Sequence, residues 1–251
     1  MFRSSVKRFL PVVLLLCMAA ATAWAADYDS VMSRWRRSIM YEDDYGGQIT
    51  VTATYYAGEY IEAMFQKEAE KNLWTSDELE NYKYELLKAL QLDEYIPIML
   101  EFDNRGPSLH MAPFDSMATL WIGSKKYSPA DYDKRLNFKL EGRAEGLVFF
   151  PKYDEKTGKP LLEGVNSIRL ILNGAISPVS MGKNYEYIWD TAKDSGQALG
   201  EGIAVGRLEA DRLIKRLQNL NADKAELEKQ LQEKNDEIAK IEARLAELQS
   251  K

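Results

Sequence analysis

Few residues in this chain have the type and spacing that catalysis requires. His110 is the only histidine, which excludes a metal site built on two histidines and a relay of several histidines. A serine triad would need His110 as its base and Ser108 or Ser116 as its nucleophile. The chain has no G-x-S-x-G motif to present either serine. The sequence therefore argues against a serine hydrolase.

Carboxylates are the remaining candidates for chemistry. Asp131 and Asp133 stand two residues apart and could offer oxygens to Ca²⁺, but the glycine and the distal glutamate of a calcium loop are missing. A carboxylate pair for sugar hydrolysis needs only proximity in space, so the sequence leaves that chemistry open. We predict no bound metal, no cofactor and no catalytic residue.

Residues 1–25 have the three parts of a secretory signal peptide. An apolar run over residues 9–20 follows a basic start and precedes an Ala-x-Ala cleavage site, and the basic residues are Arg3, Lys7 and Arg8. Cleavage near Ala25 predicts a periplasmic or secreted bacterial protein. The one cysteine, Cys17, is lost with this segment, so the mature chain has no disulfide.

Charge further restricts the partners. The net charge is −6, and loss of the three basic residues of the signal peptide makes it −9. Residues 207–251 carry equal numbers of acidic and basic side chains, so the excess negative charge falls on residues 26–206. This balance disfavours nucleic acid as a partner. After residue 25 no stretch is apolar enough to predict a transmembrane segment.

Residues 207–251 show a heptad pattern of apolar residues without glycine or proline after Gly206. Among the twelve a and d positions only Lys224 and Lys234 are polar. This spacing predicts a coiled coil of about five heptads. It also predicts an oligomer or partner interface, which we call the apolar seam: Leu213, Leu217, Leu220, Leu227, Leu231, Ile238, Ile241, Leu245 and Leu248.

The charges beside the apolar seam do not favour a parallel homodimer. In that arrangement each g residue meets the e residue five positions later on the other chain. Asp223 would then face Glu228, and Glu237 would face Glu242. Both contacts join like charges, and each costs tenths of a kcal/mol at an exposed site.

An antiparallel homodimer centred near Lys229 aligns the apolar layers but has a similar difficulty. It places Lys224 opposite Lys234, and Arg216 near Arg244. Three interpretations therefore stay open. The helix self-associates weakly; it binds another envelope protein or joins a higher-order bundle; or it folds back on its own domain.

The segments before the coiled coil predict an α+β fold with an antiparallel β-sandwich over residues 46–175. Residues 26–45 hold an amphipathic helix, Tyr28–Tyr41, and residues 176–206 form a glycine-containing connector in which Tyr185–Ala192 is helical. Period-two alternation and turn residues predict the strands, which are Gln48–Tyr56, Tyr95–Asp103, Ser116–Ile122, Leu136–Leu140, Leu147–Pro151 and Val165–Leu172. Ser128-Pro129 is expected to start one helical turn, and residues 142–146 to form a turn.

A helical hairpin is predicted as an insertion over residues 59–92. Thr75 and Glu78 have the spacing of a capping box and begin its second helix. If the protein has a ligand pocket, we expect it between this hairpin and the sheet, near Tyr55, Met64, Phe65 and Trp74.

Residues 96–173 resemble the immunoglobulin-like domains of bacterial envelope proteins and lipoproteins. The segments IPIMLEFDNRG, LEGRAEGLVFFPKYDEKTGKPL and SIRLILNG follow the strand and turn order of such domains. The resemblance implies a β-sandwich used for binding or spacing, and it assigns no functional residue. The helical insertion departs from it.

Two functions follow from these patterns. The first is a non-catalytic binding or scaffold module of the cell envelope that assembles or docks through the coiled coil. The second is a periplasmic carrier or enzyme for a small ligand, which would be stabilised by that ligand. The coiled-coil pattern favours the first.

Overall fold

The computed structural model describes residues 28–194, 199 and 202–249. The predicted signal peptide and its cleavage site lie outside these residues. The chain divides into two compact units, one ending at Gly206 and the other beginning at Arg207. Within the described part of the chain, no helix is both long and apolar enough to cross a membrane.

Five antiparallel strands form the first sheet, in the order β1-β2-β3-β7-β6. Their bounds are β1 Arg36–Glu42, β2 Gln48–Tyr55, β3 Tyr95–Leu109, β7 Leu140–Pro151 and β6 Asp131–Tyr132. The strands predicted to begin at Gln48, Tyr95 and Leu147 are confirmed as parts of β2, β3 and β7. β3 is longer than predicted, because an irregularity between Asn104 and Leu109 lets it continue its pairing with β7.

Four antiparallel strands form the second sheet, in the order β5-β4-β8-β9. They are β5 Lys125–Tyr127, β4 Ala118–Ile122, β8 Ser167–Leu172 and β9 Tyr185–Asp190. Alternate residues of both sheets share one hydrophobic core, in which Leu100 of β3 and Leu120 of β4 are fully buried. The two antiparallel sheets confirm the α+β class and the antiparallel pairing.

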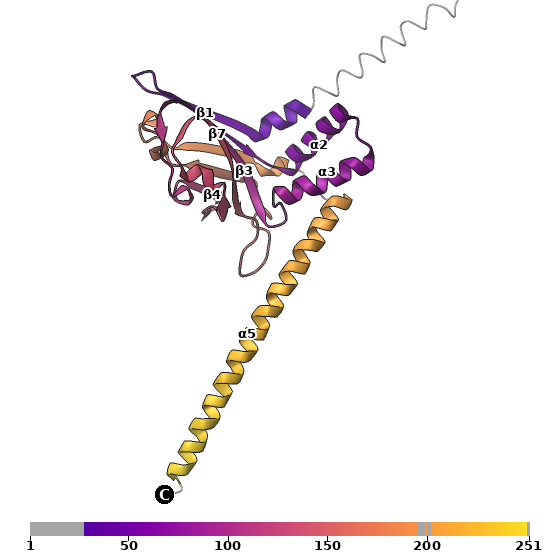
Figure 1. The fold of residues 1–251 in the computed structure, drawn as a ribbon, viewed down its shortest axis with the longest axis vertical. Coiled ribbons are helices and arrows are strands. Elements are labelled where there is room, and N and C mark those ends of the chain that lie inside the picture. The colour runs from indigo at the N-terminus through magenta and orange to yellow at the C-terminus, as the bar shows by residue number, and fades with distance from the viewer. Residues whose placement is uncertain (1–27, 195–198, 200–201, 250–251) are drawn as a thin grey trace, which may run out of the picture. The chain divides into compact units, whose positions relative to one another are not determined.

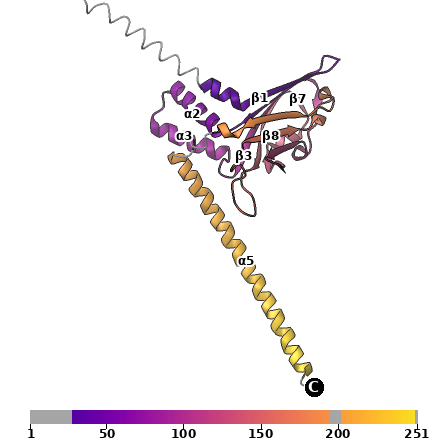
Figure 2. The ribbon, with the colours of Figure 1, turned by 180° about the vertical axis from the view of Figure 1, so that it is seen from behind.

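The predicted helical hairpin is confirmed as α2, Gly58–Asn72, and α3, Ser76–Ala89. The Thr75 hydroxyl accepts a hydrogen bond from the Glu78 N–H, and the Glu78 carboxylate accepts one from the Thr75 N–H, which completes the capping box. Both helices lie at one end of the β-strands (Figures 1 and 2). We call the two sheets together with this hairpin the β-domain.

The predicted C-terminal helix is confirmed as α5, Ile203–Gln249, which is continuous over 47 residues. Short 3-10 helices connect the other elements: η2 Phe114–Ser116, η3 Lys134–Asn137, η4 Gly174–Ile176, η5 Pro178–Ser180 and η6 Thr191–Lys193. Whether α5 forms a coiled coil stays a prediction.

The amphipathic helix predicted over Tyr28–Tyr41 is wrong in its second half. Residues 28–35 are helical, but the chain then turns into β1. β1 pairs with β2 from Arg36 opposite Thr54 to Glu42 opposite Gln48. Val31, Trp35 and Ile39 suggested a helix by their spacing, yet pairing along the whole length of β2 outweighs that weak local preference.

The helix predicted over Tyr185–Ala192 is also wrong. Tyr185, Tyr187 and Trp189 are at most 1 % exposed and alternate with exposed residues, as the inner face of a strand does. They form β9, so the segment predicted as a connector supplies an edge strand of the second sheet. The local sequence of this segment does not reveal the strand, because β9 is stabilised by pairing with β8, which lies earlier in the chain.

Three smaller predictions between residues 123 and 146 fail as well. Of the strand predicted over Leu136–Leu140, the first two residues end the 3-10 helix η3 and only Leu140 is in a strand, β7. The turn predicted over residues 142–146 lies inside β7. Ser128-Pro129 joins β5 to β6 without a helical turn. Gly142, with φ of +66°, and Gly146 are residues typical of turns, but pairing with β3 keeps this segment in the sheet.

Candidate functional site

The nine residues of the apolar seam all lie along α5, and each is 50–65 % exposed. Their three- and four-residue spacing places them along one face of the helix. Ile214, which is 56 % exposed, widens this face at an e position. α5 therefore carries a long row of large apolar side chains in contact with water.

Ion pairs within α5 stabilise the helix and leave the apolar seam uncovered. Arg212 pairs with Glu209, and Lys234 pairs with Glu237 at 2.9 Å, both at a spacing of three residues. Such pairs contribute tenths of a kcal/mol each. Full burial of one leucine contributes about 1.5–3 kcal/mol, so covering the seam is a larger source of free energy than the surface charges.

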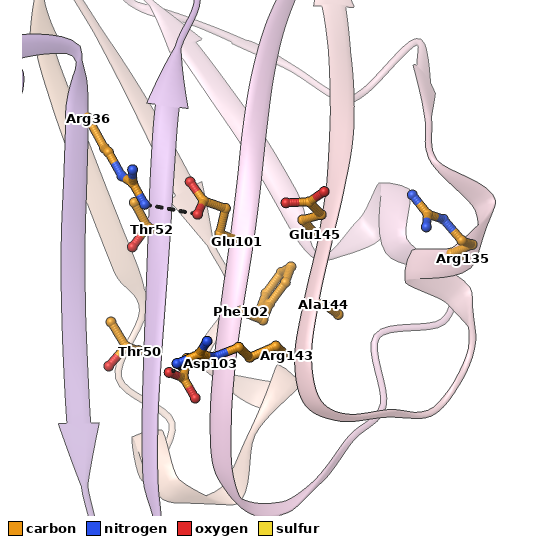
Figure 3. Close-up of a pocket in the computed structure, with 10 residues that line it drawn as sticks. All are labelled: Arg36, Thr50, Thr52, Glu101, Phe102, Asp103, Arg135, Arg143, Ala144 and Glu145. Carbon is orange, nitrogen blue, oxygen red and sulfur yellow. Dashed lines mark hydrogen bonds and ion pairs between the residues drawn. The ribbon is translucent and has the colours of Figure 1, made fainter. Parts of the chain in front are cut away.

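A charged groove of about 660 Å³ lies on the first sheet, and sequence reasoning missed it (Figure 3). Its acidic lining residues Glu101 and Asp103 alternate along β3 with the buried Leu100 and Phe102, so they point away from the core. Residues of β1, β2, β3, β7 and η3 line the groove: Arg36, Thr50, Thr52, Glu101, Phe102, Asp103, Arg135, Arg143, Ala144 and Glu145.

Ion pairs between strands hold the charged side chains of the groove, one of them spanning β2 and the other joining the neighbours β3 and β7. Arg36 of β1 binds Glu101 of β3 with an Nη2 to Oε2 distance of 2.9 Å (Figure 3). Arg143 of β7 lies 3.4 Å from Asp103, measured from Nε to Oδ2. The lining contains three arginines and three acids, so the groove suits a polar ligand that offers both donors and acceptors.

Glu101 and Glu145 are directly opposite each other in the pairing of β3 with β7. Like charges in that position destabilise a sheet. This is the type of carboxylate pair that the sequence left open for sugar hydrolysis. A general acid of such an enzyme needs a buried, protonated carboxyl, whereas Glu101 is bound to Arg36 and Glu145 is exposed. The pair therefore fits binding better than acid catalysis.

Tyr56 follows β2, and the carboxylates of Glu101 and Glu145 influence its pKa. Burial, followed by the negative charges of Tyr60, Glu101 and Glu145, raises the pKa of Tyr56 to about 12. The Tyr56 and Tyr60 rings meet edge to face at 5.3 Å. Tyr56 therefore keeps its hydroxyl proton at neutral pH and can act only as a neutral hydrogen-bonding group.

The residues predicted to line a pocket between the hairpin and the sheet fall into two packed groups. Tyr55 is 4 % exposed and meets Trp35 edge to face at 5.7 Å in the core. Phe65 is fully buried and packs with Trp74 around Tyr82, which joins α2 to α3. Met64 is half-buried on α2. Tyr55 and Phe65 are therefore core residues, whereas Trp74 and Tyr82 are half-buried beside α2 and α3.

The residues considered for a serine triad are not arranged as one. His110 is exposed in the segment after β3. The Ser116 hydroxyl donates a hydrogen bond to the carbonyl oxygen of Pro113 at 2.8 Å, within its own turn. Ser108 lies on β3 and is half-buried.

The carboxylates considered for calcium already have cationic partners. Asp131 binds the Lys134 ammonium at 2.8 Å, and Asp133 accepts hydrogen bonds from the Arg135 guanidinium. These hydrogen bonds lower the pKa of both aspartates. Within the described residues, no group of three or more potential metal ligands occurs.

One signal in the sequence could have located the groove. Glu101 and Asp103 were visible as the polar face of the predicted strand after Tyr95, but their partners on β1 and β7 were hidden. Arg36 was assigned to a helix, and Arg143 and Glu145 to a turn. The groove exists only because both segments are strands beside β3.

Comparisons with known proteins leave the family of this chain open. A scan against protein-family models finds no matching family, and searches of the curated proteins and of the solved structures return no significant match. The resemblance of residues 96–173 to immunoglobulin-like domains therefore stays a prediction. The functional argument rests on the chain's own geometry.

Proposed function

We propose that this protein is an exported, non-catalytic binding or scaffold module of the bacterial cell envelope, with a β-domain carried on a coiled-coil assembly or docking helix. The observation that supports this function is the apolar seam of α5, whose nine residues are all at least 50 % exposed. A helix face of this length and composition is typical of a partner surface.

The β-domain supports the proposal by having a core of its own. Its hydrophobic cluster is built from residues between Trp35 and Trp189, all at most 5 % exposed. None of the nine seam residues contributes to that cluster. The apolar face of α5 is thus not required by the β-domain's core, and a partner is its simplest physical reason.

Export is the part of the proposal that rests on residues 1–25 alone. We expect a bacterial host that expresses the full chain to release a mature protein beginning at Ala26 into the periplasm or the medium. Cell fractionation and N-terminal sequencing test this expectation. A cytoplasmic protein that keeps Met1 would contradict it.

The assembly function is tested by light scattering on a sizing column with the chain from residue 26 to residue 251. We expect an assembly that is lost in the double variant Leu220→Asp, Leu231→Asp. The matched control, Ala222→Asp with Ala243→Asp, adds the same charge to α5 outside the a and d positions and should behave as the wild type.

If the wild type is monomeric, a second experiment tests docking to another protein. The wild type and the seam variant are then used to capture proteins from envelope extracts. A partner held by the wild type and the control but not by the seam variant supports docking. If neither self-assembly nor a seam-dependent partner is found, the proposed function is wrong.

The groove on the first sheet favours a second candidate function, a carrier of a small polar ligand. Its volume of about 660 Å³ lies within the range of ligand sites. Thermal shift measurements with a panel of sugars and amino acids test this idea. A ligand that stabilises the wild type but not Glu101→Gln would support it, because Glu101 lies at the centre of the lining.

A further inference from the structure

We infer that α5 pairs with α5 of a second copy of this chain, antiparallel, in a register centred between Ala225 and Glu226. This inference rests on the proposed assembly function and names its partner. α5 is one uninterrupted helix, so its heptad positions form one continuous stripe, which a left-handed supercoil keeps facing the second helix from end to end. The register is shifted by one heptad from the one centred near Lys229.

In this register six of the nine seam residues meet an apolar residue of the second copy, whereas Leu217 and Leu227 face lysines and Leu245 faces Gly206. In an antiparallel coiled coil each a residue faces a d residue of the other helix. Here the numbers of two facing residues add up to 451, because the centre lies between residues 225 and 226. Ile203, an a residue that is 73 % exposed, adds a layer with Leu248. The fully apolar layers, each formed twice by the two-fold symmetry, are Ile203–Leu248, Ala210–Ile241, Leu213–Ile238 and Leu220–Leu231.

The two lysines of the seam are separated by the same shift. Lys224 faces Leu227 of the second copy, and Lys234 faces Leu217. A lysine can lay its aliphatic stem on a leucine while its ammonium group reaches water. In the register centred near Lys229, Lys224 and Lys234 face each other twice at the centre of the interface, which sets like charges together where they are least hydrated.

The flanking charges then become complementary. In an antiparallel coiled coil, g residues lie beside g residues of the other chain, and e residues beside e residues. Here the g residue Arg216 meets Glu237, so a basic side chain faces an acidic one. The charged contacts, each formed twice, are Arg216–Glu237, Glu209–Arg244 and Arg207–Glu242.

Neither competing arrangement gives this complementarity. The parallel dimer joins Asp223 to Glu228 and Glu237 to Glu242. The antiparallel register centred near Lys229 joins Arg216 to Arg244 and Asp223 to Glu237. The inferred register contains no like-charge flanking pair, and complementary flanking charges are what set orientation and register in coiled coils.

Charge reversal tests the inference, because each arrangement predicts a different sign. We expect Arg216→Glu and Glu237→Arg each to weaken the dimer by about tenfold, since each replaces two attractions by two repulsions. The double variant should restore the wild-type affinity to within about twofold. Lys229→Glu, which changes the charge equally at an f position, is the control. Sedimentation equilibrium measures all four dissociation constants.

The opposite signs would overturn the inference. If Arg216→Glu strengthens the dimer, Arg216 faces Arg244 and the register is centred near Lys229. If Glu237→Arg strengthens the dimer while Arg216→Glu has no effect, the helices are parallel. The double variant guards against a loss caused only by a disturbed helix, because it contains both substitutions.

Distances between spin labels measure the register directly. Cys17 is the only cysteine in the sequence, so in the chain from residue 26 a single introduced cysteine is the sole labelling site. Lys215→Cys and Ala243→Cys place labels at two f positions. At about 1.5 Å per residue, the inferred dimer offsets the paired labels along the axis by about 32 Å at position 215 and about 53 Å at position 243.

The alternatives give different pairs of distances. The register centred near Lys229 gives about 42 Å at both positions, and a parallel dimer gives almost no axial offset at either. A monomeric sample without label coupling overturns the homodimer, while a seam-dependent partner from envelope extracts would still support the proposed function. The two proposals therefore fail separately.

Discussion

The β-domain buries large apolar side chains in its core, whereas α5 exposes those of the apolar seam. In the β-domain, Phe150 of β7 and Trp189 of β9 are at most 1 % exposed, because the faces of two sheets cover each other. On α5, Leu227 is 65 % exposed and its seam neighbours are similar. Both regions obey a strict apolar period, of two residues in the strands and of three to four in the helix. An apolar period thus shows that a face needs covering, and only the fold shows whether the same chain supplies the cover.

The largest expected effect is the loss of a core aromatic residue. Phe150 is fully buried and lies opposite Ile96 in the sheet. We expect Phe150→Ala to lower the free energy of unfolding of the β-domain by about 3–5 kcal/mol, because it leaves a cavity. Urea unfolding followed by tryptophan fluorescence measures this change.

The matched substitution on α5 sharpens the comparison. In a dilute, monomeric sample Leu231→Ala should change the same free energy by less than about 1 kcal/mol, since Leu231 is 62 % exposed and alanine is a better helix former. An equal loss for both variants would show that Leu231 is buried within its own chain, and the contrast between the two regions would disappear.

The second expected effect is a dependence on protein concentration in one region only. If another copy covers α5, a tenfold increase in concentration stabilises the assembled helix by about 1.4 kcal/mol. The β-domain, with its own core, should unfold at a midpoint that does not change. Circular dichroism at a helix wavelength reports α5, and tryptophan fluorescence reports the β-domain. Parallel shifts of both signals would indicate that the two regions unfold as one unit.

Two neighbouring tyrosines give a smaller effect that isolates buried hydrogen bonds in the β-domain. The Tyr187 hydroxyl donates to the Val51 carbonyl at 2.8 Å and joins β9 to β2. The Tyr185 hydroxyl is buried without a hydrogen-bond partner among the described residues. We expect Tyr187→Phe to cost about 1–2 kcal/mol and Tyr185→Phe to cost less than about 0.5 kcal/mol. Equal costs, measured by urea unfolding, would contradict the assigned partners.

The smallest effect concerns Asp194, which accepts hydrogen bonds from the Tyr55 hydroxyl and the Glu59 N–H, each at 3.3 Å. Burial raises the pKa of Asp194, against these hydrogen bonds, which favour its ionised form. The folded state then holds the proton more tightly than the unfolded state. Its contribution to stability is complete below the ordinary aspartate value of 3.8 and is lost as the pH rises through the raised pKa.

Asp194→Asn removes this titration and keeps one acceptor oxygen, so it retains the hydrogen bond from the Tyr55 hydroxyl or from the Glu59 N–H but not both, a loss that does not depend on pH. Relative to the variant, the wild type should lose stability as the pH rises from 3.8 through the raised pKa of Asp194. Unfolding midpoints of both proteins across that interval measure the difference. A difference that does not change with pH, or one that favours the wild type at higher pH, would show that burial does not dominate the environment of Asp194.

Local patterns predicted the elements whose stabilising contacts are close in sequence. The Thr75 and Glu78 capping box and the long helix α5 are of this kind, because their hydrogen bonds join residues a few positions apart. The strand beginning at Gln48 was also predictable, since strict alternation of large and β-branched residues over eight positions leaves little competition. The apolar seam followed from the same kind of periodicity.

The failures lie where a distant strand decides the local structure. Arg36 and Tyr185 begin strands that were predicted as helices, and each lies at the edge of a sheet. Their hydrogen-bond partners, β2 and β8, are supplied by tertiary pairing, which a local period does not reveal. The charged groove was missed for the same reason, because Arg36, Glu101 and Glu145 come from three strands.

The sequence by itself determined that residues 207–251 form a long helix with one apolar face, and that the preceding segment alternates between strands and a helical hairpin. Helical hydrogen bonds and side-chain periods are local, so they can be read along the chain. The tertiary structure decided which apolar faces are covered and which charged side chains meet. Strand pairing brings together residues far apart in sequence, such as Trp189, whose indole N–H donates to the Trp35 carbonyl at 2.8 Å. On α5 the nine side chains of the apolar seam stay at least 50 % exposed, although they follow as regular a period as the buried strands.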